Sequence, residues 1–439
     1  MRYKKLMIPF LILDALIILA VLLYQLPPVQ NKLAWRIDSI RAKIKYALNP
    51  PEEAVFTPQN QGTSVSEIVQ ETLTALAPAT TPTPSPYPAT PTATKPGPTQ
   101  TPFPTDTPTI TPTPLPTKVV LKGVVHEFQK WNNCGPANLA MALSYWKWKG
   151  DQRDTAAFLK PNQRDKNVMP YELTAFVNKE TDFKALWRPG GDLDLLKRLI
   201  AAGFPVIIEK GFEGPGFDGW MGHYELLSSY DDKKARFLAQ DSYIMPNLPV
   251  PYEDVEKYWQ HFNYTFVLVY PPERENEVLD LLGPLADETS SYQLAAQKAS
   301  EEIFSSEGRR KAFAWYNRGT NLVYLDDYAG AAQAYDNYFK IYATLDSKKV
   351  NLPWRNVWYQ TGPYWAYFYT GRYYDVINLA TTTIAAVSEP AIEETWYWRA
   401  MAKEALGDKQ GAIADLEKAV ELNSHFGSAQ RALDRLRGG

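Results

Sequence analysis

The chain contains a single cysteine, Cys134, in a setting that could make its thiol reactive. Pro136 suits the first turn of a helix, because its missing N–H would have had no partner there. Apolar residues then follow at helical spacing, namely Leu139, Ala142, Leu143 and Trp146. Cys134 is therefore predicted at a helix N-terminus, where the helix dipole and the free amides favour the nucleophilic thiolate. The alternative is a thiol that packs as a small hydrophobe.

A thiolate nucleophile needs a base, and the chain has four histidines. His223 opens a predicted strand after a glycine-rich loop, so its imidazole could project from a sheet edge into a cleft. Asp241 ends the next predicted strand, and a hairpin would return it beside His223, where it could orient the ring and stabilise its charged form. Gln129, five residues before the cysteine, could donate its amide to an oxyanion together with the Cys134 N–H. Loops, helices or the end of the chain are predicted for the other histidines, His126, His261 and His425.

The elements that would position these residues lie between about residues 119 and 270. Helices are predicted over 135–148, 170–178 and 193–202, and strands over 206–210, 223–229, 236–240 and 265–270. Because the helices precede the strands, the pattern predicts an α+β domain.

The order of these features resembles the bacteriocin-processing cysteine peptidases, family C39, and their relatives. Those proteins have a Gln, a Cys-Gly pair that opens a helix, a later Gly-His strand and an Asp after a hairpin. The resemblance implies a papain-like fold, with Cys134 as nucleophile, His223 as base, Asp241 as the residue that orients it and Gln129 as the oxyanion residue. It covers about residues 119–270, a third of the chain.

Two features set this sequence apart from the better-known members, which are cytoplasmic domains of export transporters that cleave after a double glycine. No transporter domain is recognised in these 439 residues, so leader processing is not carried over. The acidic, aromatic loop 211–220 directly precedes His223, and it is either a flap that selects substrate or a flexible connector. No His/Cys/Asp cluster has metal-ligand spacing, and neither a metal nor a cofactor is expected.

The N-terminal region predicts a membrane anchor. Residues 6–26 are almost wholly apolar and, at ~1.5 Å per residue, long enough to cross a ~30 Å hydrocarbon layer. No small-x-small cleavage site follows, which favours an uncleaved anchor over a signal peptide. Basic residues on both sides leave the topology undecided from charge. Residues 30–77 contain a basic helix that either lies on the membrane surface or is simply solvated.

Residues 78–117 alternate Thr and Pro and are interpreted as an extended stalk. Such stalks are typical of surface-exposed proteins, so the folded part is expected outside the cytoplasm.

Beyond about residue 285 the sequence becomes helical, and three segments share tetratricopeptide spacing. Their marker residues are Trp315, Gly319, Leu322, Tyr328, Ala331 and Tyr335 in the first, Tyr364, Tyr367, Gly371, Tyr373 and Val376 in the second, and Trp396, Ala400, Gly407, Ala412, Leu416 and Ala419 in the third. An insertion is expected around 347–354. The alternative is a plain helical bundle. The surplus aromatic residues could line a groove, but at these spacings most are more simply core.

The predicted organisation is an anchor at 1–29, a juxtamembrane helix and linker at 30–77, a stalk at 78–117, a cysteine peptidase domain at 118–272 and a tetratricopeptide-like region at 285–439. A net charge of -3 argues against a nucleic acid partner. The expected function is that of a surface-anchored peptidase acting on a peptide or protein substrate, with repeats that bind substrate or a protein partner. The alternative is a catalytically inactive papain-like module that binds peptides.

Overall fold

The computed structural model describes Ile40, Ile44 and residues 56–59, 114–214, 219–347, 349–387 and 390–438. These belong to two compact units, Met1–Asn60 with Pro116–Gly439, and Gln61–Leu115. The description below concerns the first unit. The expected anchor at 6–26 and most of the Thr/Pro tract lie outside the described residues. None of the helices within the described ranges combines the length and apolarity needed to cross a membrane.

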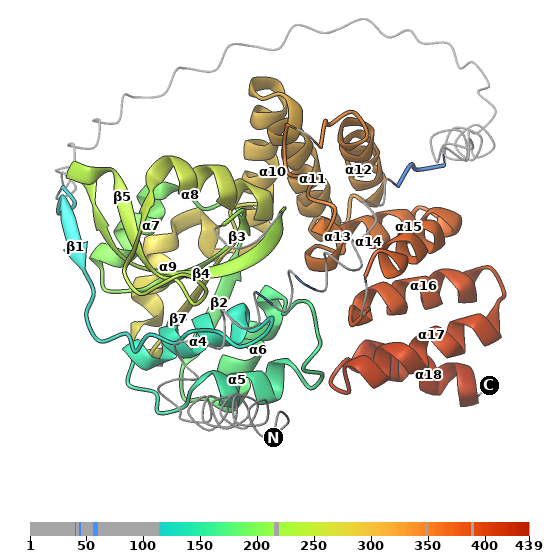
Figure 1. Cartoon of the computed structure of the whole chain (residues 1–439), viewed down its shortest axis with the longest axis horizontal. Helices are drawn as coiled ribbons and strands as arrows, with labels where there is room; N and C mark the ends of the chain where they lie inside the picture. Colours follow the sequence, from blue (N-terminus) through green and yellow to red (C-terminus); the bar gives the residue numbers. More distant parts are fainter. Residues whose placement is uncertain are drawn as a thin grey trace, which may run out of the picture. The chain divides into compact units, whose positions relative to one another are not determined.

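Strands of the described region form one seven-stranded antiparallel sheet in the order β2-β7-β3-β4-β5-β6, with β1 also paired to β4 (Figure 1). The strands are β1 Lys118–Val120, β2 Lys184–Arg188, β3 Val206–Phe212, β4 Met221–Asp231, β5 Arg236–Gln240, β6 Leu248–Pro251 and β7 Phe266–Tyr270. The four predicted strands correspond to β3, β4, β5 and β7, which confirms them within a few residues.

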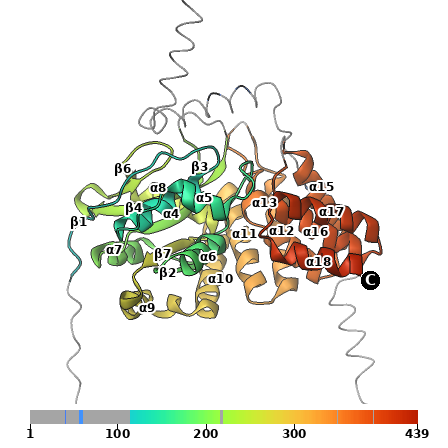
Figure 2. The same cartoon turned by 90° about the horizontal axis from the view of Figure 1, so that it is seen from below.

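Helices cover both faces of this sheet (Figure 2). They are α4 Cys134–Tyr145, α5 Gln152–Leu159, α6 Pro170–Glu180, α7 Leu193–Ala201, α8 Tyr252–Trp259 and α9 Glu275–Leu282, with short 3-10 turns η1 Asp232–Lys234, η2 Gln260–Phe262, η3 Pro272–Arg274 and η4 Gly283–Ala286. Ile207 packs with the cluster of α4 and α6, whereas its neighbour Val206 packs with that of α7 and α8. This alternation follows from the two-residue period of a strand. The predicted α+β class is confirmed.

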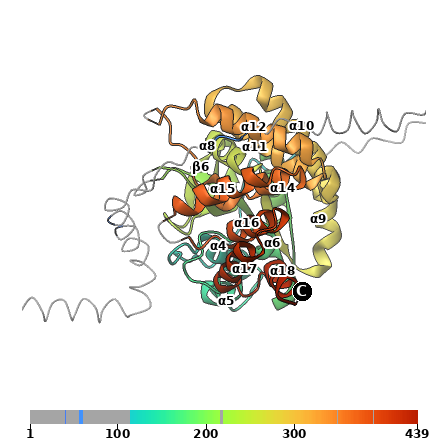
Figure 3. The same cartoon turned by 90° about the vertical axis from the view of Figure 1, so that its right-hand side faces the viewer.

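The C-terminal region is helical. Its elements are α10 Glu288–Ser305, α11 Gly308–Tyr324, α12 Tyr328–Tyr342, α13 Asn356–Tyr359, α14 Gly362–Tyr369, α15 Tyr373–Ala385, α16 Glu393–Ala405, α17 Lys409–Leu422 and α18 Gly427–Gly438. The pairs α11/α12, α14/α15 and α16/α17 are the three predicted repeats, and Figure 3 shows the pair α16/α17 beside α18. Gly371 and Gly407 end the first helix of their pairs with φ of 73° and 85°, a conformation that glycine adopts without strain.

Buried aromatic residues form the core of the repeats, as the spacing predicted. Tyr316, Tyr335 and Tyr364 are each 0% exposed. Tyr335 packs so close to Gly319 that a Cβ there would lie 2.8 Å from its ring. The expected insertion is the segment between α12 and α13.

The repeats pack directly against the sheet-containing region. The ring of His261, in η2, stacks on Phe313 of α11 with centroids 3.9 Å apart. Asn263 and Asn321 exchange side-chain hydrogen bonds of 2.6 and 3.1 Å, and both residues are buried. Asn263 has φ of 54°, a left-handed conformation that asparagine tolerates better than most residues. A buried, polar and specific interface of this kind fixes the two regions to each other.

Candidate active site

Cys134 is the first residue of α4, as predicted, and its side chain is half-buried. The preceding Asn133 makes no capping hydrogen bond with its side chain, so it does not occupy the first amides of the helix. The following Gly135 packs closely, since a Cβ there would lie 3.3 Å from Val168 and 3.4 Å from Tyr224. A reachable thiol therefore stands at the positive end of a helix dipole.

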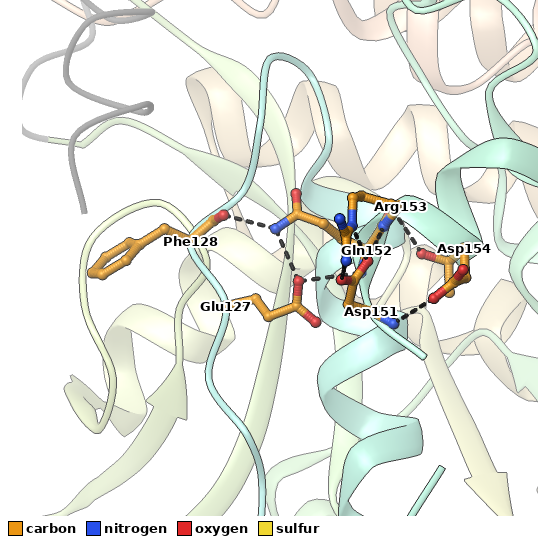
Figure 4. Close-up of polar contacts among 7 residues, drawn as sticks. Glu127, Phe128, Asp151, Gln152, Arg153 and Asp154 are labelled. Carbon is orange, nitrogen blue, oxygen red and sulfur yellow. Dashed lines mark hydrogen bonds and ion pairs between the residues drawn. The ribbon is translucent and has the colours of Figure 1, made fainter. Parts of the chain in front are cut away.

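The loop before α4 is held by Gln152, which is 5% exposed (Figure 4). Its side-chain amide donates to Phe128 O at 2.8 Å and to Glu127 Oε2 at 3.0 Å. Its carbonyl oxygen accepts from the Lys130 N–H and from Asn133 Nδ2, both at 2.9 Å. Gln152 in turn begins α5, so the start of α5 fixes the segment that carries Gln129 and leads into Cys134.

The start of α5 is itself fixed by a capping box, also drawn in Figure 4. Asp151 accepts from the Arg153 N–H at 2.7 Å, and the Asp154 carboxylate accepts from the Asp151 N–H at 2.8 Å. Capping satisfies amides that the first turn would otherwise leave unpaired.

His223 and Asp241 meet across the β4-β5 hairpin, as expected. Leu226 pairs with Gln240, which places Asp241 beside the start of β4. His223 Nε2 and Asp241 Oδ2 are 3.0 Å apart, and the two side chains are 1% and 0% exposed. The other carboxylate oxygen accepts from the backbone N–H groups of Tyr243 at 2.7 Å and Ile244 at 2.6 Å. Asp241 is thus locked in place, and it fixes the orientation of the imidazole.

The second ring nitrogen of His223, Nδ1, is not engaged by Asp241. It is buried and has no hydrogen-bond partner among the described residues. The thiol lies close enough for the two groups to shift each other's pKa through a hydrogen bond and through charge. The structure therefore places the Cys134 thiol near a buried imidazole whose Nε2 is already bonded to Asp241.

The pKa values of all three groups are shifted from their ordinary values. Burial alone would lower the pKa of His223, but the charge of Asp241 and hydrogen bonds to Asp241 and Cys134 raise it to about 10. Burial alone would raise the pKa of the Cys134 thiol, yet the hydrogen bond and charge of His223 bring it below its ordinary value. Burial opposes ionisation of Asp241 too, and the charge of His223 lowers its pKa to about 2. All three directions favour the ionised forms, which is the state a thiolate nucleophile requires.

Gln129 is oriented by two residues that the sequence did not single out. Ser242 Oγ donates to Gln129 Oε1 at 2.9 Å, and Asn138 Nδ2 donates to Ser242 Oγ at 3.0 Å. Asn138 also donates to the carbonyls of Cys134 at 3.0 Å and Tyr224 at 2.7 Å. Because the amide oxygen of Gln129 is engaged, its NH2 group is the end free to serve an oxyanion. Asn138 lies one helical turn beyond Cys134, a spacing that could have drawn attention to it.

A buried ion pair lies beside the histidine, and strand patterning gave no sign of it. Lys210 pairs in register with His223, and its Nζ is 2.7 Å from Glu225 Oε2, with side chains 9% and 0% exposed. The positive charge of Lys210 also helps to lower the pKa of Asp241.

The described flanks of the loop before His223 are held by the repeats. Glu213 forms an ion pair with Arg309, and Arg355 Nη1 donates to Trp220 O at 2.5 Å. The Trp220 ring is 0% exposed and stacks on Phe262. Residues 215–218 lie outside the described part of the chain. The choice between flap and connector remains a prediction.

Parts of the chain are similar to known proteins. Residues 121–267 match the model of the Peptidase_C39 like family, and residues 393–426 match the tetratricopeptide repeat. A crystal structure from Bacillus anthracis, of a protein provisionally described as a C39-like peptidase, shares 20% sequence identity; the match covers 35% of this chain and 96% of that one, with a TM-score of 0.29. No curated protein is significantly similar to the chain.

Proposed function

We propose that this chain, a C39-like peptidase domain joined to a tetratricopeptide repeat region, hydrolyses peptide bonds through Cys134, His223 and Asp241. The observation that carries the proposal is the buried His223–Asp241 pair, which lies near the thiol at a helix N-terminus and shifts its pKa. A purely structural role would not require an ionised imidazole, thiolate and carboxylate close together, because each charge costs free energy to bury.

The proposed reaction proceeds through a thioester. The Cys134 thiolate attacks the peptide carbonyl, and the oxyanion accepts hydrogen bonds from the Gln129 amide and the Cys134 N–H. His223 gives its Nδ1 proton to the leaving amine, and the acyl group stays on sulfur. His223 then takes a proton from water, the hydroxide attacks the thioester, and the thiolate leaves. Asp241 holds the imidazole in the required orientation throughout.

Attachment and location form a second part of the proposal. The apolar stretch 6–26 would anchor the chain in a membrane, with the folded part outside the cytoplasm. The repeats would bind the substrate or a protein partner, as helical repeats commonly do. Protease treatment of intact cells tests the location: digestion of the folded part supports it, and full protection contradicts it.

Peptide cleavage tests the catalytic proposal. The purified full-length chain is incubated with a peptide library, and new termini are identified by mass spectrometry for wild type, Cys134→Ala and Cys134→Ser. We expect cleavage by wild type and a loss of at least ~1,000-fold in both variants, because serine keeps the shape but not the thiolate. Cleavage that persists in Cys134→Ala would come from another enzyme. No cleavage by a wild type with an inert thiol would favour the inactive peptide-binding module.

A further inference from the structure

Phe56, from the N-terminal linker, is buried among side chains of the repeats. It is 6% exposed, although Thr57 and Gln59 beside it are exposed. Its ring meets Phe339 edge to face with centroids 4.9 Å apart and lies 6.2 Å from Tyr367. The pocket that it shares is also lined by Tyr338, Phe339, Tyr342, Trp354, Val357 and Leu379.

The backbone beside Phe56 is recognised as well. The Gln59 N–H donates to Asp375 Oδ1 at 2.8 Å, and Asp375 Oδ2 accepts from Arg372 Nε at 2.7 Å. Pro58 restricts Thr57 to an extended conformation, which lowers the entropy lost on docking. One aromatic anchor and one main-chain hydrogen bond are the features by which a groove binds an extended peptide.

The chain that follows this segment returns to the same folded unit. At its far end, Tyr230 Oη donates to Pro116 O at 2.6 Å and the Asp232 N–H donates to Thr117 O at 2.9 Å. From Lys118 the chain pairs with β4. Contacts therefore hold the chain on both sides of residues 61–115.

We propose that this aromatic pocket of the repeats is a receptor for residues 56–59 of the same chain, so that one folded unit holds the chain both at residues 56–59 and from residue 116 onward. The separation between the apolar stretch 6–26 and the folded unit is then set by residues 27–55. The tract would not act as the spacer that its composition suggested. A tethered ligand of this kind competes at an effective concentration that reaches the millimolar range.

Nicking the tract tests the proposal on the full-length chain. A specific protease site is inserted within residues 78–113, the chain carries an N-terminal affinity tag, and the protein is cut in detergent and captured through the tag. We expect the C-terminal fragment to be captured with wild type and with the control Thr57→Ala, whose side chain is exposed. We expect capture to fall at least ~10-fold with Phe56→Ala, because the anchor is lost. Release from the wild type, or capture that survives Phe56→Ala, overturns the proposal.

A peptide of residues 53–61 provides the second readout. It should bind the Phe56→Ala chain at least ~10-fold more tightly than wild type, where the tethered segment competes. Equal affinity for the two chains contradicts docking within the chain. Mixing tagged and untagged uncut copies distinguishes the source of the segment: capture of untagged copies would show that a second copy supplies it and would overturn the same-chain occupant.

Discussion

Replacing Asp241 by asparagine should destabilise the fold by about 2–3 kcal/mol at pH 7, because it removes the partner of His223. Burial opposes the carboxylate charge, but His223 lowers the pKa of Asp241 from 3.8 to about 2. A tenfold change in an ionisation constant corresponds to ~1.4 kcal/mol, which gives ~2.5 kcal/mol for this group. The pKa of His223, raised from 6.5 to about 10, would give ~5 kcal/mol. The smaller energy applies to the Asp241–His223 pair, because the pKa shift of His223 also includes its interaction with Cys134.

The direction of the pH dependence follows from the same shifts. The pKa of Asp241 is depressed, so its contribution is present above pH 3.8 and is lost as the pH falls through about 2. The pKa of His223 is raised, so its contribution is complete below pH 6.5 and is lost as the pH rises through about 10. The difference in unfolding free energy between wild type and Asp241→Asn should therefore be largest between pH 3.8 and pH 6.5, where both contributions are present. It should shrink as the pH rises toward 10.

Urea unfolding followed by tryptophan fluorescence across this pH range measures the difference, with the exposed Asp280→Asn as a control for removal of one charge. An Asp241→Asn variant as stable as wild type at pH 7 would refute the reasoning. So would a stability difference that stays constant between pH 6.5 and pH 10.

Three further predictions concern the surroundings of the site. Lys210→Met should cost ~3–5 kcal/mol of unfolding free energy because Glu225 is left buried without its cation, and adding Glu225→Gln should restore most of it; failure of the second change to help would contradict the pairing. Alanine at Asn263 and at Asn321 should be non-additive, with a coupling of about 1–2 kcal/mol in a denaturation double-mutant cycle, and additivity would show that the amide pair contributes nothing. Ser242→Ala should slow peptide turnover about 10-fold or more by freeing the Gln129 amide while leaving the pH profile of thiol alkylation in place; a shifted profile would assign Ser242 a different role.

Local signals in the sequence predicted much of the sheet-containing domain. Pro136 and the apolar period after it placed the start of α4 correctly, because both act within one or two helical turns. The hairpin between β4 and β5 brought Asp241 beside His223 because strand alternation and a short turn determine register.

What the sequence did not reveal depends on contacts between distant segments. The Lys210–Glu225 pair exists because β3 lies beside β4, and nothing near either residue in the chain indicates that the other will neutralise it. The same holds for Asn138, whose partners come from α4, β4 and the end of β5. Phe56 is more distant still, since its pocket is built by residues almost three hundred positions later. Local periodicity carries no information about such pairings.

The most direct measurement is the pH dependence of Cys134 alkylation by iodoacetamide in the full-length chain, compared with His223→Ala. Because Cys134 is the single cysteine of the 439 residues, all modification reports on this thiol. The account predicts that wild type reacts well below pH 7 and that His223→Ala loses this reactivity, because the imidazolium that stabilises the thiolate is gone. An inert thiol, or one that titrates near ~8.5 with or without His223, would contradict a Cys–His ion pair and with it the proposed peptidase.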